Sequence, residues 1–412
     1  MQYALVILDG ASGCPVPEFG GRTSLEASRT PCLDHLAQTG ITGLMQNVPP
    51  SKESGSDVAC LSIMGYDPAA FDLGRGGIEA AALGICLEPG QVAFRLNLCY
   101  VEDGVMRGYS TDNISTEDGN ALAAELKSAL DSDTFTLYPG TSFRQVLVVN
   151  GHPELMGLAY ATPHDNTGRD ITAAYQPQLP GGGGIPEGHA AYEAAHALTG
   201  YIQAANKVLA ASPLNARRVG AGLWPANHVW AFWPGMRPSS LVPFAQRHHK
   251  KAVVNSAVDL LKGLAFMTGM RYCEFAGVTD GPTNDFAAQG RGAISLLKEG
   301  NEVVIVHVEA PDAAGHDGRP DEKRNSIEQS DAHILAPLLE YARSHPLRIA
   351  VMPDHPTPLT TRKHSREPVP FVLAGPGVSH NGAQRMTEAQ AGATGLLLAE
   401  GHTFMGSLFL AE

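Results

Sequence analysis

The chain has 412 residues, 43% of them hydrophobic, and its formal net charge is −13 at pH 7. Such a chain can bury a large core, and its length predicts two domains or one domain with a large insertion. The negative charge argues against nucleic acid and anionic membrane surfaces as partners. An anionic substrate would therefore need a local positive patch.

Targeting signals and cysteine pairing patterns are both missing from the sequence. The first residues form an apolar, β-prone segment without a basic leader, and no apolar run reaches the length of a membrane span. Six cysteines occur without a C-x-x-C pair, which argues against a zinc ribbon or a disulfide framework. We therefore expect a cytoplasmic protein whose cysteines are reduced and mainly buried.

The first predicted element is a strand over residues 3–8, directly followed by Asp9 and Gly10. A continuous apolar run of this kind is typical of a central parallel strand buried on both faces. Its last residue delivers a carboxylate to the edge of the sheet, where open α/β sheets place their chemistry. Asp9 is thus a candidate metal ligand.

The next informative segment is Ser54-Gly-Ser56-Asp57, after which apolar residues recur with helical spacing. Ser56 would lie at the start of that helix, where free backbone N–H groups and the helix dipole favour an alkoxide or a bound phosphate. A metal ion would activate the hydroxyl further. On this segment alone, however, capping of the helix by Ser54, Ser56 or Asp57 is the favoured interpretation.

The Gly74-Arg75-Gly76 segment looks suited to phosphate but lacks the lysine of a Walker motif. A hinge or interface loop is the interpretation that the residues favour.

Alternating β-prone and helical patterns predict an α/β protein with a mostly parallel sheet sandwiched by helices. The expected core strands are residues 3–8, 227–232, 252–255, 303–308 and 347–352, and the expected helices are residues 25–39, 256–268, 285–298 and 324–343. Residues 90–222, with strand-like pieces at 134–138 and 144–149, form a smaller inserted α+β domain that covers the substrate. Residues 1–89 and 223–412 then make the metal-binding core domain.

Two motifs near the C-terminus gather acids and imidazoles in the order of metal ligands. Asp312 and His316 stand four residues apart, which places both on one face of a helical turn where they can hold one ion. Asp354-His355 follows the apolar run 347–353, at the end of an expected buried strand, and His364 follows soon after. Each residue alone could be an ordinary polar loop residue, but together they predict half of a two-metal site.

These motifs resemble a known family, the cofactor-independent phosphoglycerate mutases of archaeal type within the alkaline phosphatase superfamily. The resemblance runs through most of the chain; its metal and nucleophile motifs are specific, whereas its middle third is not. The matching segments are Asp9-Gly10, Gly55-Ser56-Asp57, Gly65-Tyr-Asp-Pro68, Gly74-Arg-Gly76, His307 to His316, Asp354-His355 and His364 to Pro370.

The resemblance implies an alkaline phosphatase-like core fold and a ligand set of seven residues, all filled by the expected types. Asp312, His316 and His364 would hold one divalent ion, and Asp9, Ser56, Asp354 and His355 would hold the other. Ser56 would take the phosphoryl group from one hydroxyl of a phosphoglycerate and return it to the neighbouring hydroxyl.

The chemistry of the ligands agrees with this expectation. Phosphoryl transfer needs positioning and neutralisation of charge on the transferring oxygens, which two ions roughly 3.5–4 Å apart provide. Carboxylate and imidazole ligands without cysteine suit Mn²⁺, Mg²⁺, Co²⁺ or Zn²⁺. We expect two divalent ions, with manganese as the first choice.

The chain departs from the family where substrate is expected to bind. Archaeal-type mutases carry an arginine-rich stretch after the segment that reads Phe94-Arg95 here, whereas this chain keeps only Arg107. A lysine expected after Thr283-Asn284 is also missing, and Arg291 is the available substitute. These changes look closer to a bacterial branch of the family that has been proposed to act as homoserine kinase.

Several other residues are candidates for substrate binding. His164, Asp165 and Arg169 occur in a segment that resembles one facing the active site in the family, although a polar turn explains them equally well. Arg144 and Arg237 could hold phosphate by bidentate contacts, and solvated surface is the alternative for each.

The sequence therefore predicts a metal-dependent phosphoglycerate mutase, an isomerase of glycolysis that acts on a small phosphorylated metabolite. A homoserine kinase-like phosphotransferase or a phosphomonoesterase of the same superfamily is the alternative. A non-catalytic metabolite binder is disfavoured, because it would have lost some of the seven core residues. The sequence leaves the oligomeric state open.

Overall fold

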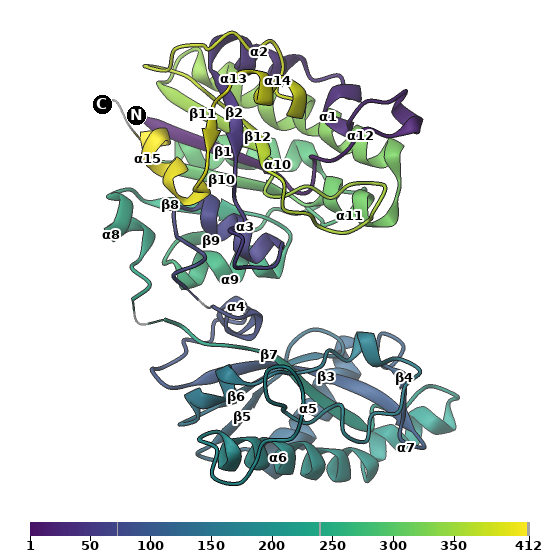
Figure 1. The fold of residues 1–412 in the computed structure, drawn as a ribbon. Helices are drawn as coiled ribbons and strands as arrows, with labels where there is room; N and C mark the ends of the chain where they lie inside the picture. Colours follow the sequence, from purple (N-terminus) through teal and green to yellow (C-terminus); the bar gives the residue numbers. More distant parts are fainter. Residues whose placement is uncertain (72, 239, 410–412) are drawn as a thin grey trace. The chain divides into compact units, whose positions relative to one another are not determined.

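The computed structural model describes residues 1–71, 73–238 and 240–409, and they divide into two compact units (Figure 1). The first comprises Met1–Phe71 and Leu241–Glu412, and the second comprises Asp72–Ser240. The expected insertion, residues 90–222, lies within the second unit, whose limits are wider at both ends. Each unit has its own sheet, so each is described by itself.

The first unit is built on an eight-stranded, mostly parallel sheet with the strand order β13-β2-β12-β11-β1-β10-β8-β9. Its strands are β1 (Gln2–Leu8), β2 (Ile41–Met45), β8 (Ala252–Asn255), β9 (Arg271–Cys273), β10 (Val303–Val308), β11 (Leu347–Met352), β12 (Val369–Ala374) and β13 (Leu397–Leu398). β12 is antiparallel to both of its neighbours, whereas β1 pairs in parallel with β10 and β11. The expected strands at 3–8, 252–255, 303–308 and 347–352 are confirmed.

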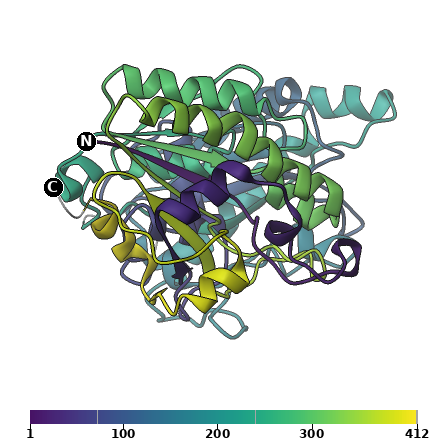
Figure 2. The same cartoon turned by 90° about the horizontal axis from the view of Figure 1, so that it is seen from above.

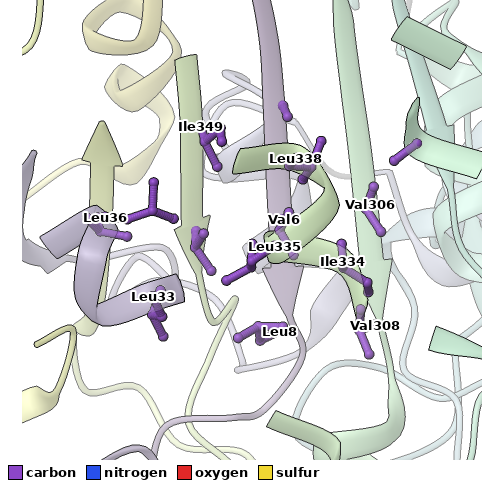
Figure 3. Close-up of a cluster of buried hydrophobic side chains, with 14 of the residues drawn as sticks. Val6, Leu8, Leu33, Leu36, Val306, Val308, Ile334, Leu335, Leu338 and Ile349 are labelled. Atoms are coloured by element: carbon purple, nitrogen blue, oxygen red, sulfur yellow. The ribbon is translucent and has the colours of Figure 1, made fainter. Parts of the chain in front are cut away.

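Strand β1 is buried on both faces, as its continuous apolar run predicts. Val6 and Leu8 point into a cluster that includes Leu33 and Leu338 from helices on one side of the sheet (Figure 3). On the other side the ring of Tyr3 lies 4.9 Å from that of Phe409. The sheet therefore lies between two helical layers, and the predicted fold class is confirmed.

The first unit has helices in all four expected ranges, two of which are broken into shorter segments, and further helices outside these ranges. They are α1 (Ser24–Ala27), α2 (Pro31–Thr39), α3 (Ser56–Ile63), α8 (Phe244–His248), α9 (Asp259–Met267), α10 (Phe286–Lys298), α11 (Ala310–Asp317), α12 (Pro320–Ser330), η4 (Asp331–Leu335), α13 (Ala336–Ala342), α14 (Glu388–Ala393) and α15 (Phe404–Phe409), with short 3-10 turns η1 (Pro17–Phe19) and η5 (Gly401–Thr403). Helices α10 and α13 contact each other and the sheet, and their green ribbons run side by side in Figure 2.

The second unit is an α+β unit around a five-stranded antiparallel sheet. Its elements are α4 (Arg75–Ala82), β3 (Val92–Glu102), β4 (Val105–Gly108), α5 (Thr116–Leu130), β5 (Phe135–Tyr138), β6 (Arg144–Val149), η2 (Pro153–Gly157), η3 (His164–Asn166), α6 (Tyr192–Ala210), α7 (Pro213–Gly220) and β7 (His228–Gly235). The strand-like pieces predicted at 134–138 and 144–149 are β5 and β6.

One predicted strand belongs to the other sheet. The run 227–232 was expected in the core sheet of the metal-binding domain, but it forms β7, which pairs antiparallel with β3 of the second unit. An apolar run indicates burial on both faces but carries no information about its partner strand. Residues 227–232 were therefore correctly expected to form a strand, but the expected sheet was wrong.

Burial of the cysteines also differs from the expectation. All six cysteines are free, as predicted, but only Cys60 and Cys99 are buried, while Cys14 and Cys86 are exposed. Cys14 and Cys86 lie outside helices and strands, where the backbone follows the surface. None of the helices within the described ranges combines the length and the apolar character of a membrane span.

Candidate metal centre and nucleophile

The candidate site lies at the carboxyl ends of the central parallel strands of the first unit. Asp9 directly follows β1, Glu309 directly follows β10, and Asp354 follows β11 after one proline. β1 lies between β10 and β11 in the sheet (Figure 1), so parallel pairing brings these residues to one edge. The acids from the two ends of the sequence therefore meet, as the strand pattern predicts.

The first group of ligands combines α11 with a loop. Asp312 and His316 lie one turn apart on α11, as their spacing predicts, and His316 Nε2 is 3.2 Å from Asp312 Oδ2. His364 Nε2 lies 3.6 Å from Asp312 Oδ1 and 2.8 Å from His316 Nε2. Two imidazole nitrogens and a carboxylate oxygen thus converge within 4.8 Å of one another.

The second group is buried at the strand ends. Its members are Asp9, Asp354 and His355, each at most 1% exposed. His355 Nε2 lies 3.3 Å from Asp354 Oδ2 and 3.7 Å from Asp9 Oδ1. Backbone N–H groups of Gly10 and His355 donate to Asp354 Oδ1 and fix its orientation. Among the described residues, Asp9 Oδ1 has no hydrogen-bond partner, which leaves a buried acceptor available.

The electrostatics of these groups favour a divalent cation. Burial and the charges of Asp354 and Asp312 raise the pKa of Asp9 well above its usual value. Burial and Asp9 likewise raise the pKa of Glu309. Burial opposes the charge on Asp312, but hydrogen bonds from His316 and His364 hold its pKa well below the usual range. Several buried acids that destabilise one another fit a site completed by positive ions.

Ser56 is the first residue of α3, and its side chain does not cap the helix. The N-cap residue is Gly55, and no side chain makes a capping hydrogen bond. Instead, Ser56 Oγ lies 3.2 Å from Asp9 Oδ2 and 3.1 Å from His355 Nε2. The interpretation of Ser54, Ser56 or Asp57 as a cap is therefore wrong, and the hydroxyl points to the second ligand group.

His307 and Glu309 also belong to this site, although neither was among the candidates from sequence. Together with Asp9 they form a third group of residues with converging ligand atoms. His307 Nε2 lies 2.8 Å from Asp9 Oδ2, and its Nδ1 lies 3.0 Å from Ser256 Oγ, which fixes the ring. The sequence signal that could have found His307 is an imidazole within an otherwise apolar strand, because His307 is the last residue but one of β10.

Thr357 and Lys323 support the first group and were also missed. The Thr357 hydroxyl donates to Asp312, and the backbone carbonyl of Thr357 accepts a 2.6 Å hydrogen bond from Lys323 Nζ. Lys323 is fully buried and also donates to the carbonyl of Ser12 in the segment after β1. A lysine in a strongly polar helix reads as solvated, so the sequence held no signal for this position.

The six candidate substrate-binding residues are distributed over both units, and all are exposed. Arg291 lies on α10 of the first unit, 3.8 Å from Asp285. Arg144, His164, Asp165, Arg169 and Arg237 belong to the second unit. Within that unit the ring of His164 lies 6.1 Å from Tyr109 and 5.7 Å from Trp233. Their role in binding stays a prediction.

Comparison with known proteins agrees with the site. A family model described as 2,3-bisphosphoglycerate-independent phosphoglycerate mutase matches residues 37–215. A protein of Methanosarcina barkeri named as a mutase of this kind is 39% identical over 376 residues, which covers 90% of each chain.

Two solved structures share the fold along nearly the whole chain. A protein of Pyrococcus horikoshii has a TM-score of 0.82 and 28% identity, with 99% of this chain and 96% of that chain covered. A cofactor-independent phosphoglycerate mutase of Thermoplasma acidophilum has a TM-score of 0.70 and 26% identity, with 99% and 98% covered. The resemblance stated from the motifs is confirmed: the chain belongs to the family of 2,3-bisphosphoglycerate-independent phosphoglycerate mutases.

Proposed function

We propose that this enzyme interconverts 3-phosphoglycerate and 2-phosphoglycerate through a phosphoserine at Ser56. The observation that carries the proposal is the position of Ser56 Oγ, which lies within hydrogen-bond distance of both Asp9 and His355 at the start of a helix. Membership of the mutase family supplies the reaction, and the geometry of the serine supplies the covalent route.

A single serine oxygen accepts the phosphoryl group and returns it. The Ser56 Oγ–phosphorus bond forms while the bond from phosphorus to one substrate oxygen breaks, and the proton lost by Ser56 ends on that oxygen. The return transfer uses the neighbouring hydroxyl and restores the serine. Backbone N–H groups at the start of α3 lie next to Oγ and favour the negative charge of the phosphoryl group.

The ligand groups fit two divalent ions, for which manganese is our first choice and magnesium, cobalt or zinc the alternatives. Asp312, His316 and His364 would hold one ion, and Asp9, Ser56, Asp354 and His355 would hold the other. The buried, unpaired Asp9 Oδ1 supports this assignment, because a cation would satisfy it. When bound, such ions lower the pKa of a coordinated hydroxyl and neutralise charge on the transferring oxygens.

Substrate binding is assigned to cationic and polar side chains on the surface of the two units. We propose that His164, Asp165, Arg169, Arg144, Arg237 and Arg291 include the groups that hold phosphate and carboxylate. Their exposure supports this assignment, since a small anion can reach them. The loss of the arginine-rich family stretch favours a homoserine kinase-like reaction as the second candidate.

The test is a turnover assay on metal-loaded protein followed by ³¹P NMR, with 3-phosphoglycerate in one series and ATP with homoserine in the other. Conversion of 3- to 2-phosphoglycerate, and a phosphoserine at Ser56 in mass spectra after exposure to substrate, are the expected results. Ser56→Ala should abolish turnover. Ser54→Ala is the matched control, because Ser54 Oγ donates to the carbonyl of Ser365 rather than to the acids.

Near wild-type turnover of Ser56→Ala would rule out the covalent route. Phosphorylation of homoserine, without mutase turnover at millimolar 3-phosphoglycerate, would replace the mutase by the kinase-like function.

A further inference from the structure

On one face of the sheet of the second unit, arginines lie among apolar residues such as Val146 and Phe232. Successive residues of β3 alternate between the faces, and Phe94, Leu96 and Leu98 pack into the cluster that contains residues of α5 and α6. Arg95 and Asn97 therefore point to the opposite face. In the neighbouring strand β6, Arg144 is paired with Asn97, so Arg95 and Arg144 are diagonal neighbours on that face.

Helix α4 brings a third arginine and an acid to these two. A Cβ atom on Gly74 would lie 2.0 Å from the carbonyl oxygen of Pro234, and one on Gly76 would lie 2.2 Å from that of Ala93. The glycines of the Gly-Arg-Gly segment thus let the helix start directly against β3 and β7. Arg75 and Gly76 are helical rather than part of a loop, and a hinge role of the segment stays a prediction. Arg75 is the first residue of the helix, and Glu79 lies one turn further along.

Glu79 links the arginines but neutralises only part of their charge. Its Oε1 atom lies 3.2 Å from Arg75 Nε and also 3.2 Å from Arg95 Nη1. Arg95 is only 7% exposed. Burial, together with the charges of Arg144 and Arg75, lowers its pKa to about 10 against the effect of Glu79. One carboxylate therefore pairs with two of the three guanidinium groups, and the buried Arg95 is repelled by the other two arginines.

Trp233 is held in an unfavourable backbone conformation beside these arginines. Its φ is 49°, in the left-handed region, and it lies where the pairing of β3 with β7 shifts register. Such a conformation is unfavourable for a residue that is not glycine, and bulges of this kind redirect side chains. The Trp233 ring lies 4.6 Å from Arg75 Cζ and 5.5 Å from Arg95 Cζ. His164 packs against the same ring.

We propose that Arg75, Arg95 and Arg144, with Trp233 and His164 beside them, form a binding site for the carboxylate or phosphate group of a small organic anion. On the proposed function, on which the identity of the ligand rests, this anion is phosphoglycerate. The site draws its positive charge from three separate elements, α4, β3 and β6. A purely structural Arg95–Glu79 pair would gain nothing from two further arginines beside it, since they disfavour its charge.

The test measures anion binding to the full chain after metal has been removed with EDTA, so that the metal centre cannot hold the ligand. 3-Phosphoglycerate, glycerate and glycerol 3-phosphate are titrated separately, by calorimetry and by tryptophan fluorescence. Binding of 3-phosphoglycerate with a change in tryptophan fluorescence is expected. Glycerate and glycerol 3-phosphate show whether the site takes the carboxylate or the phosphate.

Arg75→Ala and Arg144→Ala should each weaken binding at least about tenfold, because each removes a charge-assisted contact from an exposed side chain. Arg217→Ala is the matched control: Arg217 is exposed on α7, which packs against α5 on the covered side of the unit. Circular dichroism confirms that the variants fold.

Equal affinity of both variants and the control would overturn the site, as would the absence of binding to the metal-free chain by all three anions at millimolar concentration. Failure of the proposed function has a different signature. Binding of 3-phosphoglycerate through these arginines without its conversion would support the anion site and contradict the mutase function. Conversion that does not depend on these arginines would support the mutase function and contradict the anion site.

Discussion

The two units gather charges of opposite sign by different structural means. In the first unit, carboxylates collect where parallel strands end, because loops at that edge leave the sheet together. In the second, guanidinium groups collect on one face of an antiparallel sheet. The register of β3 with β6 and the close packing of α4 against β3 and β7 bring them together. Both clusters are partly buried, and each is neutralised only in part by its own unit.

The comparison shows that a net charge of −13 describes neither site. Groups of one sign that are withdrawn from water raise one another's free energy, whatever the charge elsewhere on the surface. Asp9 and Arg95 are each buried beside charges of their own sign, which favour the neutral form of both side chains. Removing metal or single residues tests whether the two clusters act independently.

Removal of metal should affect the two units most differently. We expect EDTA to lower mutase turnover at least about a hundredfold, because charge neutralisation worth several kcal/mol is lost, and Mn²⁺ to restore it. Binding of 3-phosphoglycerate to the second unit should persist in the same sample. Turnover that survives complete removal of metal, checked by elemental analysis, would contradict the metal assignment.

Removal of one ligand should affect only the first group. His364→Ala should weaken the binding of one of two ions by at least about 10- to 100-fold, since one of three ligands is lost while Asp9, Asp354 and His355 remain. Calorimetric titration with Mn²⁺ measures the change. His333→Ala, an exposed histidine of η4, is the control and should bind both ions normally. Loss of both ions together in His364→Ala would mean that the groups act as one site.

The first of these sites could be predicted from sequence because its signals are local. Asp9 and Asp354 follow continuous apolar runs, and the spacing of Asp312 and His316 is that of a helical turn, so each motif predicts its own geometry. Lys323 gave no such signal, because its burial depends on how α12 packs against segments distant in sequence.

Arg144 and His164 of the second site were candidates from sequence, but their assembly with Arg75 and Arg95 could not be predicted, for a physical reason. Arg75, Arg95 and Arg144 come together only through the register of two strand pairs, the bulge at Trp233 and the close approach of a helix. No period in the sequence encodes these relations. The same limitation placed residues 227–232 in the wrong sheet, since an apolar strand does not indicate its partner.

Acid should destabilise the second unit through His228. This side chain is 8% exposed, and burial lowers its pKa to about 4 from an ordinary value of 6.5. The unfolded chain binds a proton more readily between these values, so the free energy of unfolding is constant above pH 6.5 and falls as the pH drops to 4. The loss is about 3 kcal/mol.

Urea unfolding followed by tryptophan fluorescence at several pH values measures this loss, because the three tryptophans, Trp224, Trp230 and Trp233, all belong to the second unit. His228→Gln should flatten the pH dependence. His248→Gln, in the first unit, should leave the same curve unchanged although burial also lowers the pKa of His248 to about 4. An equal slope in wild type and His228→Gln would show that other groups cause the acid effect.

The smallest expected effect tests the close approach of α4 to its sheet. Gly76→Ala places a methyl group 2.2 Å from a backbone oxygen that cannot move aside, so we expect the free energy of unfolding of the second unit to fall by about 1–3 kcal/mol. Gly200→Ala is the matched control within α6, where a Cβ atom meets nothing within 4 Å. It should raise the same free energy by about 0.5–1 kcal/mol, because alanine loses less conformational freedom in a helix.

Binding of 3-phosphoglycerate shows whether the position of α4 also matters for the anion site. If Gly76→Ala weakens this binding and Gly200→Ala does not, the close approach of α4 matters because it positions Arg75. Unchanged binding in a destabilised Gly76→Ala protein would limit the role of this close approach to packing.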